Sequence, residues 1–470
     1  MKHSALLLFL AAGAAGLPAS AAPLSCFTNS ASTPTIRSNG LWERAGDMLV
    51  ICFGGTPTPA GSAVPKIDLT VALAPAVNIT SRPPSPGQNA SEALAIIDEP
   101  APANQRACPA PANCTLHGAT SGNTGINFAN PGAASNGGQQ VRNVYQADAP
   151  SGGTIAIRGI PFDAPGDLAV RTIRISNVYL NAAQLGVPPG IATFVNATIS
   201  NSGGVNLNLP PAPLAIASAI EPVTYALLDA AGQPSSPIVL NRSAGNNAAL
   251  AANPFATSAP QGSTFQVRMR EVEAGLLHVR NGANWPNPNH EPDLVPQNQL
   301  GQLFTSETGF YNPAFPAQGG MRLAGLPTRG TRVIVRFSAL PAGVKLFSPV
   351  RIVEPTVGTT LRRVFSFDNG DSGPLFLPVF ATSPVDGGIA PLAGCPSDCH
   401  AVFEITSTDF SARDLVGLPF YVAFAPNAPA GAVSFRATLA PTSTHGGATA
   451  LTAPRFAPPT APPIPAVQIQ

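Results

Sequence analysis

The chain has 470 residues, enough for two domains of ordinary size, and 10% of them are charged, against about 25% in an average soluble protein. A net charge of +1 gives no overall attraction to nucleic acid or to an anionic membrane, so we expect no nucleic-acid partner. The 53 prolines and 44 glycines exclude many long helices, since proline in a helix interior costs about 3 kcal/mol. With 44% hydrophobic residues, this composition predicts a folded all-β protein with long Pro/Gly/Asn-rich loops.

The first 21 residues have the pattern of a secretory signal peptide. Lys2 supplies the positive charge, residues 5–17 the apolar core, and Ala19-Ser20-Ala21 a small-residue cleavage site before Ala22. The apolar core is too short for a transmembrane helix, and we expect no transmembrane anchor. An ordinary N-terminal helix and a lipoprotein signal acylated at Cys26 are the alternatives. We predict cleavage between Ala21 and Ala22 and a secreted protein, with the periplasm or the cell surface as further locations.

The stretch from Asp47 to Leu73 predicts an opening hairpin. An apolar run that ends at Cys52 is followed by a turn rich in Gly and Pro. After the turn, apolar and polar residues alternate strictly, which is typical of a strand with one buried face. Ile67, Leu69, Val71 and Leu73 fall on one face, and the other face carries Lys66, Asp68, Thr70 and Ala72.

Further strand-like runs are separated by turn-rich segments along the rest of the chain. Residues 91–100 favour a strand over a single helical turn, and residues 214–228 hold two runs that divide at Pro222, where a helix would be broken. Many short strands at this spacing indicate sandwiches. The other expected strands are 154–160, 170–180, 191–200, 264–272, 332–337, 364–367, 375–380, 401–406, 420–424 and 433–439.

The runs of turn-forming residues suggest the domain limits. The fold class that we predict is two β-sandwich-like domains. The predicted division is a signal peptide at 1–21, a first domain at 22–231, a linker or long loop at 232–262, a second domain at 263–440 and a Pro/Ala-rich tail at 441–470.

The six cysteines form an even set in a chain with an export signal, which indicates disulfides. Six cysteines allow 15 connectivities, and closeness in sequence favours three of them as pairs. The first pair closes the longest loop and is expected to stabilise the fold by about 3 kcal/mol. A metal site at the last pair with His400 is the alternative, but no second pair lies nearby in sequence. The favoured pairs are Cys26–Cys52, Cys108–Cys114 and Cys395–Cys399.

One basic cluster occurs, formed by Arg268, Arg270, His278 and Arg280. Glu271 and Glu273 lie among these residues and are expected to neutralise part of the charge. We interpret the cluster as a solvated strand face.

The segment Gly370-Asp371-Ser372-Gly373-Pro374 resembles the sequence around the nucleophile of chymotrypsin-like peptidases. It has one glycine fewer, and no histidine stands in that family's Ala-Ala-His-Cys context. We interpret it as a hairpin loop. Calcium bound by Asp368 and Asp371 is an alternative, although the spacing of the known calcium loop is missing. We therefore expect no catalytic residue, no cofactor and no metal.

Several short segments resemble a group of secreted Ala/Pro/Thr-rich β-proteins of unknown function from soil acidobacteria. They are rich in turns and follow one another in order over most of the chain. The resemblance implies a bacterial origin, export and β-rich domains, and it brings no activity or site. The segments include Gly54-Gly55-Thr56-Pro57-Thr58, Ile160-Pro161-Phe162-Asp163-Ala164-Pro165-Gly166 and Ser306-Glu307-Thr308-Gly309-Phe310-Tyr311-Asn312-Pro313, with residues 46–47, 50–52, 77–82, 91–94 and 97–100.

These observations favour a secreted or cell-surface, non-enzymatic protein with a structural or adhesive role. The first alternative is a module that binds extracellular polysaccharide or a cell-surface protein, in which Trp42, Trp285 or Tyr311 would offer stacking surface. A secreted hydrolase with a carboxylate pair is the second alternative.

Overall fold

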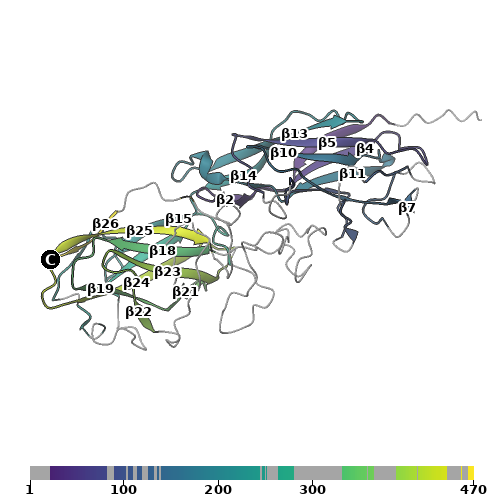
Figure 1. The fold of residues 1–470 in the computed structure, drawn as a ribbon. Coiled ribbons are helices and arrows are strands. Elements are labelled where there is room, and N and C mark those ends of the chain that lie inside the picture. The colour runs from purple at the N-terminus through teal and green to yellow at the C-terminus, as the bar shows by residue number, and fades with distance from the viewer. Residues whose placement is uncertain are drawn as a thin grey trace, which may run out of the picture.

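In the part of the chain that it describes, the structure, a computed structural model, is built mainly from β-strands and includes a short 3₁₀ helix, η3 (Ala182–Leu185). It describes residues 22–81, 89–101, 104–108, 114–118, 125–131, 135–136, 139–243, 246–248, 250, 263–279, 331–356, 358–364, 388–409, 411–441, 457 and 464–470. The signal peptide predicted at 1–21 and the strand predicted at 375–380 lie outside these residues. The predicted fold class, all-β with two sandwich-like domains, is confirmed (Figure 1).

The first domain contains two five-stranded sheets. One has the order β1 (Ser25–Ser30), β4 (Met48–Gly54), β11 (Gly166–Ser176), β6 (Leu94–Ile97) and β9 (Val144–Gln146). The other has the order β10 (Thr154–Pro161), β5 (Lys66–Ala74), β13 (Thr193–Gly203), β14 (Leu214–Ile220) and β2 (Thr35–Arg37). Two small pairs accompany them: β3 (Glu43–Arg44) with β12 (Tyr179–Leu180), and β7 (Ser135–Asn136) with β8 (Gln139–Gln140).

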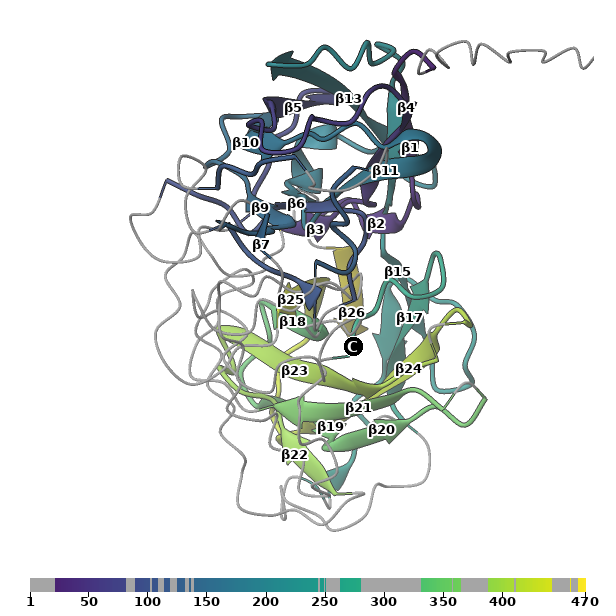
Figure 2. The same ribbon diagram turned by 90° about the vertical axis from the view of Figure 1, so that its right-hand side faces the viewer.

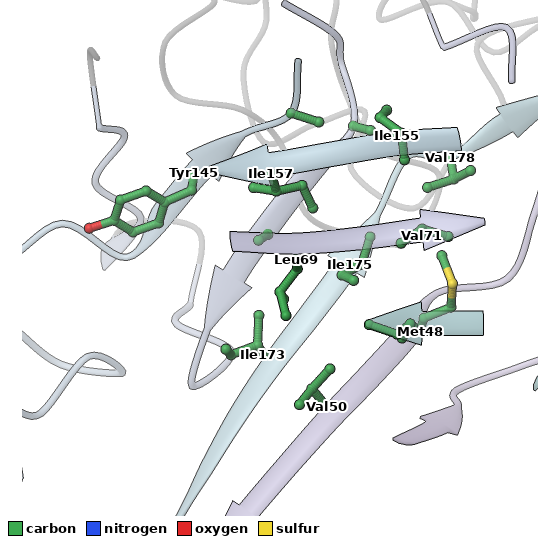
Figure 3. Close-up of a cluster of buried hydrophobic side chains, with 14 of the residues drawn as sticks. Met48, Val50, Leu69, Val71, Tyr145, Ile155, Ile157, Ile173, Ile175 and Val178 are labelled. Carbon is green, nitrogen blue, oxygen red and sulfur yellow. The ribbon is translucent and has the colours of Figure 1, made fainter. Parts of the chain in front are cut away.

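The core of the first domain lies between these two sheets. The predicted alternation in β5 is confirmed, because Ile67, Leu69 and Val71 are fully buried. They face apolar side chains of β4 and β11 in the opposite sheet, as Figure 3 shows for Leu69 and Val71 beside Met48 and Ile175. Burying one apolar face of each sheet is therefore what joins the two layers.

The second domain has one five-stranded and one seven-stranded sheet. The first has the order β15 (Val223–Leu228), β17 (Phe265–Glu271), β24 (Leu415–Phe424), β19 (Val344–Pro349) and β22 (Ile389–Pro391). The second has the order β16 (Ile238–Leu240), β26 (Ile464–Ile469), β25 (Gly431–Pro441), β18 (Thr331–Ser338), β23 (Asp398–Ser407), β21 (Thr360–Val364) and β20 (Arg351–Val353). Phe265, Phe337, Phe420 and Phe435 stack or meet edge to face between the sheets.

The two domains part earlier in the chain than the sequence predicts. β14 belongs to the first core and β15 to the second, with only Glu221 and Pro222 between them. The sequence shows the break at Pro222, but the predicted domain limits place the strand-like runs on both sides of it in the first domain. Which sheet a strand joins depends on its partner, and the partner of β15 is β17, about 40 residues further on, which local spacing does not reveal.

The predicted linker 232–262 and the predicted tail 441–470 both contribute strands. β16 lies within the first and β26 within the second, and they pair with each other in parallel. Ile238, Leu240, Val467 and Ile469 are buried in the second core. β16 and β26 therefore extend the seven-stranded sheet, although the sequence before β26 is rich in proline and alanine.

The strand predicted at 170–180 is divided in two. Asn177 lies between β11 and β12 with a φ of 59°, in the left-handed region where asparagine is among the few tolerated side chains. The turn lets Tyr179 and Leu180 leave the sheet and pair with β3.

The domains touch through buried polar groups at their junction. Arg37 forms an ion pair with Glu43 at 2.7 Å, and its Nη1 also donates to the Thr331 hydroxyl of β18 at 3.2 Å. The same hydroxyl accepts the backbone N–H of His278 at 3.1 Å. Figure 2 shows the junction between β2 of the upper lobe and β18 of the lower one.

Disulfides join Cys26 to Cys52, Cys108 to Cys114 and Cys395 to Cys399. The first links directly opposed residues of β1 and β4, so that it ties an edge strand to its sheet. The Cys395–Cys399 bridge occupies both thiols of the metal alternative. The His400 ring lies near the Asp398 carbonyl oxygen, with its Nδ1 at 3.0 Å.

We expect the Cys26–Cys52 bond to contribute more stability than the Cys395–Cys399 bond, because their sequence separations are 26 and 4. Replacing both members of the first pair with alanine should lower the free energy of unfolding by about 3 kcal/mol, against about 2 kcal/mol for the second pair. Equilibrium urea unfolding of the two double variants measures both values. A larger loss for the second pair would contradict the prediction.

Candidate functional site

A groove of about 470 Å³ lies on the outer face of the second domain, over β15, β17 and the start of β24. Three arginines line it, two from β17 and one from the loop before β24, together with small, aromatic and aliphatic side chains. The groove is lined by Thr224, Tyr225, Ala226, Arg268, Arg270, Arg413, Asp414 and Leu415.

The register of the sheet places Arg268 and Arg270 side by side. The two residues are separated by one position in β17, so their side chains leave the same face about 7 Å apart. Their neighbours in β15 are Ala226 and Thr224. On the other side, Arg268 is opposite Gly417, which has no side chain, and Arg270 is opposite the exposed Leu415. Apart from Leu415 these neighbours are small, and Arg270 is exposed while Arg268 is partly exposed.

The sequence suggests that Glu271 and Glu273 neutralise Arg268 and Arg270, but in the structure neither carboxylate pairs with them. Arg268 and Arg270 form no hydrogen bond or ion pair with any described residue. Glu271, expected to neutralise them, is buried on the opposite side of the strand, with 1% of its surface exposed. Glu273 instead pairs with Arg413 at 3.2 Å, where both side chains are about half exposed.

Two buried carboxylates hold the end of the groove in place. One oxygen of Glu271 accepts the backbone N–H groups of Leu276 and Leu277 at 2.6 and 2.8 Å, and the other accepts that of Asp414 at 3.0 Å. Asp414 in turn accepts the hydroxyl groups of Thr359 and Thr408. The Glu271–Asp414 brace therefore fixes the backbone beside Arg413 and Leu415.

The brace does not have the geometry of a catalytic carboxylate pair. Burial raises the pKa of the Glu271 carboxyl above its ordinary value, while the backbone N–H donors lower it. The nearby Asp414 carboxylate adds to the rise. Both carboxyl groups are almost fully buried, and their oxygens already accept hydrogen bonds from the chain. The hydrolase alternative required two carboxylates facing a cleft, and this pair faces the protein interior.

Tyr225 carries a polar group with no hydrogen-bond partner among the described residues. Its hydroxyl oxygen is inaccessible to solvent, and the pKa of this phenol is raised by burial first and by the charge of Glu221 second. The residue packs partly against the core beneath the groove. It therefore contributes apolar surface and one unsatisfied hydroxyl to the wall.

The chemistry that such a groove supports is the recognition of anions. Guanidinium groups present fixed planar donors that match carboxylate, sulfate or phosphate oxygens. No group of three or more His, Cys, Asp or Glu that could hold a metal ion occurs in the described part of the chain. Within that part, no helix is long and apolar enough to cross a membrane.

The aromatic residues suggested for sugar stacking are not brought together. Trp42 is only 4% exposed and stacks on Tyr179, with ring centroids 3.9 Å apart and an interplanar angle of 4°. It is part of the fold, which corrects the suggestion that it offers a binding surface. Trp285, Tyr311 and the loop from Asp368 to Pro374 lie outside the described residues.

Only part of the groove was predictable from sequence. Arg268 and Arg270 were recognised as a basic strand face. His278 belongs instead to the domain junction, and Arg280 lies outside the described residues. Arg413 was missed, because it reaches the groove only through the pairing of β17 with β24.

Replacing Trp42 with alanine should destabilise the first domain by about 3–5 kcal/mol, since a large buried ring is removed from a stacked pair. Thermal unfolding measures this loss. Binding of the anionic ligands tested below, measured well under the melting temperature, should be unchanged; a selective loss of binding with normal stability would contradict the buried role.

Replacing Asp414 with alanine should destabilise the second domain by about 2–3 kcal/mol, because the buried hydroxyl of Thr359 and the partly buried one of Thr408 lose their acceptor. Asp409 is a matched control: it is an exposed carboxylate of the same loop that accepts hydrogen bonds from Ser411, and its replacement should cost clearly less stability. Urea unfolding of both variants provides the comparison. Equal losses would show that the brace contributes little.

No protein-family model and no curated protein matches the sequence. Solved structures that are similar include the C-terminal domain of the AgI/II polypeptide BspA of Streptococcus agalactiae, at 7% identity and a TM-score of 0.28, over 89% of this chain and 100% of the other. A DUF4466 family protein from Parabacteroides merdae is similar at 9% identity and a TM-score of 0.19, over 86% of this chain and 99% of the other. These values are too low to transfer a function to this chain.

Proposed function

We propose that this is a non-enzymatic, secreted or surface-exposed adhesive protein that uses the arginine groove of its second domain to hold anionic groups of an extracellular partner. The observation that carries the proposal is the pair Arg268 and Arg270, which share one face and have no carboxylate partner among the described residues. In a chain with only 24 acidic and 25 basic residues, two adjacent unpaired arginines concentrate positive charge at one place.

Three further features support an adhesive role over catalysis. The groove is partly open to solvent, its floor is a β-sheet, and the residues that line it include no histidine, cysteine or serine. The export signal and the paired cysteines of the sequence fit an oxidising extracellular location. Rigid strands that present fixed donors favour binding without rearrangement.

The proposal is tested by binding to a soluble polyuronate, with neutral dextran as the uncharged comparison. We expect binding to the polyuronate alone, and we expect it to weaken as salt is added, because exposed charge pairs are screened. Replacing Arg268 and Arg270 together with glutamine should weaken binding at least tenfold, since each removes a charged donor.

The matched control is Arg351→Gln, which removes an exposed arginine from β20 in the other sheet of the same domain. It should leave the affinity within about twofold. Equal weakening by the control and by Arg268→Gln alone, which removes the same charge, would mean that net charge, and not the groove, determines binding. Absence of binding to any polyanion would refute the proposed function.

A further inference from the structure

We propose that the groove receives an extended acidic peptide segment, which adds as a new strand to the free edge of β15. This inference rests on the proposed function, that the groove holds anionic groups, and it names the partner as a peptide. Three observations carry it: the free backbone of β15, a hollow that runs along the strand, and the arginines one strand away.

β15 is an edge strand with unpaired backbone groups. The Pro222 carbonyl accepts the Val272 N–H, so in this antiparallel ladder Thr224, Ala226 and Leu228 bond to β17, while Val223, Tyr225 and Leu227 point away from it. The Leu227 carbonyl is taken by the Ser235 N–H at 3.0 Å. Among the described residues, the N–H and C=O groups of Val223 and Tyr225 have no partner.

A hollow follows this edge. The arginine groove continues at Tyr225 and Ala226 into a second depression of about 340 Å³, whose other wall includes Leu227, Ser235 and Phe435. Along β15, the charged surface of the arginine groove is therefore followed by the apolar surface of the second depression. An extended chain fits this arrangement, since its backbone can pair with the edge while its side chains enter the depressions on either side.

Arg268 and Arg270 lie where they can contact the side chains of an added strand. Such a strand would lie about 10 Å from β17, two strand spacings away, with only Thr224 and Ala226 between them on the outer face. Because these two side chains are small, Arg268 and Arg270 can extend across β15. Their spacing of two residues matches acidic side chains at alternate positions of the added strand.

A peptide explains the free backbone groups better than a polysaccharide does. Val223 and Tyr225 offer donors and acceptors at the repeat of an extended polypeptide, which is the repeat that another strand satisfies. An acidic sugar polymer would use the arginines and leave the edge unpaired. A second copy of this chain would use the edge and leave the arginines unpaired.

The test uses a synthetic peptide, Thr-Glu-Val-Glu-Val-Glu-Thr, and two forms of it that are N-methylated at either the valines or the glutamates. Methylation removes alternate N–H donors without changing charge or side chains. We expect one methylated form to bind at least tenfold more weakly than the parent and the other to bind within about threefold, because only one set of N–H groups faces β15. Isothermal titration calorimetry with the full chain measures the three affinities.

Protein variants give a second test from the other side of the contact. Tyr225→Pro removes the edge N–H, which is not part of the ladder, and should weaken the parent peptide at least tenfold. Tyr225→Val, which keeps the N–H and loses the ring, should weaken it less. Polyuronate binding should survive the proline substitution, because it depends on Arg268 and Arg270. If the proline variant melts at a lower temperature, the methylated peptides decide the question.

Equal binding of all three peptides would overturn strand addition and leave the anion-binding groove intact. Binding of the polyuronate without binding of any peptide would have the same consequence. Failure of both ligands would refute the proposed function together with this inference. Self-association of the chain that Tyr225→Pro abolishes would identify the occupant as a second copy, which would also overturn the proposal.

Discussion

Face-to-face burial of two sheets is the constraint on which each domain depends. Ile67, Leu69 and Val71 face the opposite sheet in the first domain, and Phe265, Val267 and Met269 do so in the second. Since side chains alternate along a strand, fixing these residues inside fixes their neighbours outside. Arg268 and Arg270 lie on the outer face because Val267 and Met269 are buried. The groove is thus a direct consequence of core packing, and its two central arginines could not be moved inward without reversing the whole strand.

The same alternation explains how much the sequence predicts. β5 and β17 are regular over seven or more residues, so both their existence and their buried faces were foreseeable. β16 has three residues, and β26 begins next to prolines, so neither has a period that is long enough to recognise. The pairing partner of each strand could not be predicted from the sequence for a different reason. That β15 leaves the first domain, and that Arg413 comes to lie beside Arg270, follow from pairings between residues far apart in sequence.

Some of the acidic residues in the described chain hold loops against these sheets. Asp163 accepts the backbone N–H groups of Thr58 and Ile126 at 2.7 and 2.6 Å, which fastens two loops to the first domain. Glu271 performs the same task for residues 276–277 and 414 in the second. The Glu271 carboxylate is used by these backbone donors and forms no ion pair with Arg268 or Arg270. Arg268 and Arg270 therefore stay without an acidic partner among the described residues, because the carboxylate next to them in sequence holds loops instead.

The position of Arg268 and Arg270 determines which partners the open edge of β15 attracts. An unpaired edge is a template for any extended chain, and proteins usually protect it with charges or prolines on the edge strand itself. β15 carries neither at Thr224, Tyr225 and Ala226, and the positive charges stand one strand further in. From there they do not block the backbone of Val223 and Tyr225, but they set the electrostatic potential that an incoming strand meets. A basic strand is repelled and an acidic one is attracted. The arginines therefore make the edge of β15 selective for acidic strands, whereas an uncharged edge would accept any sequence.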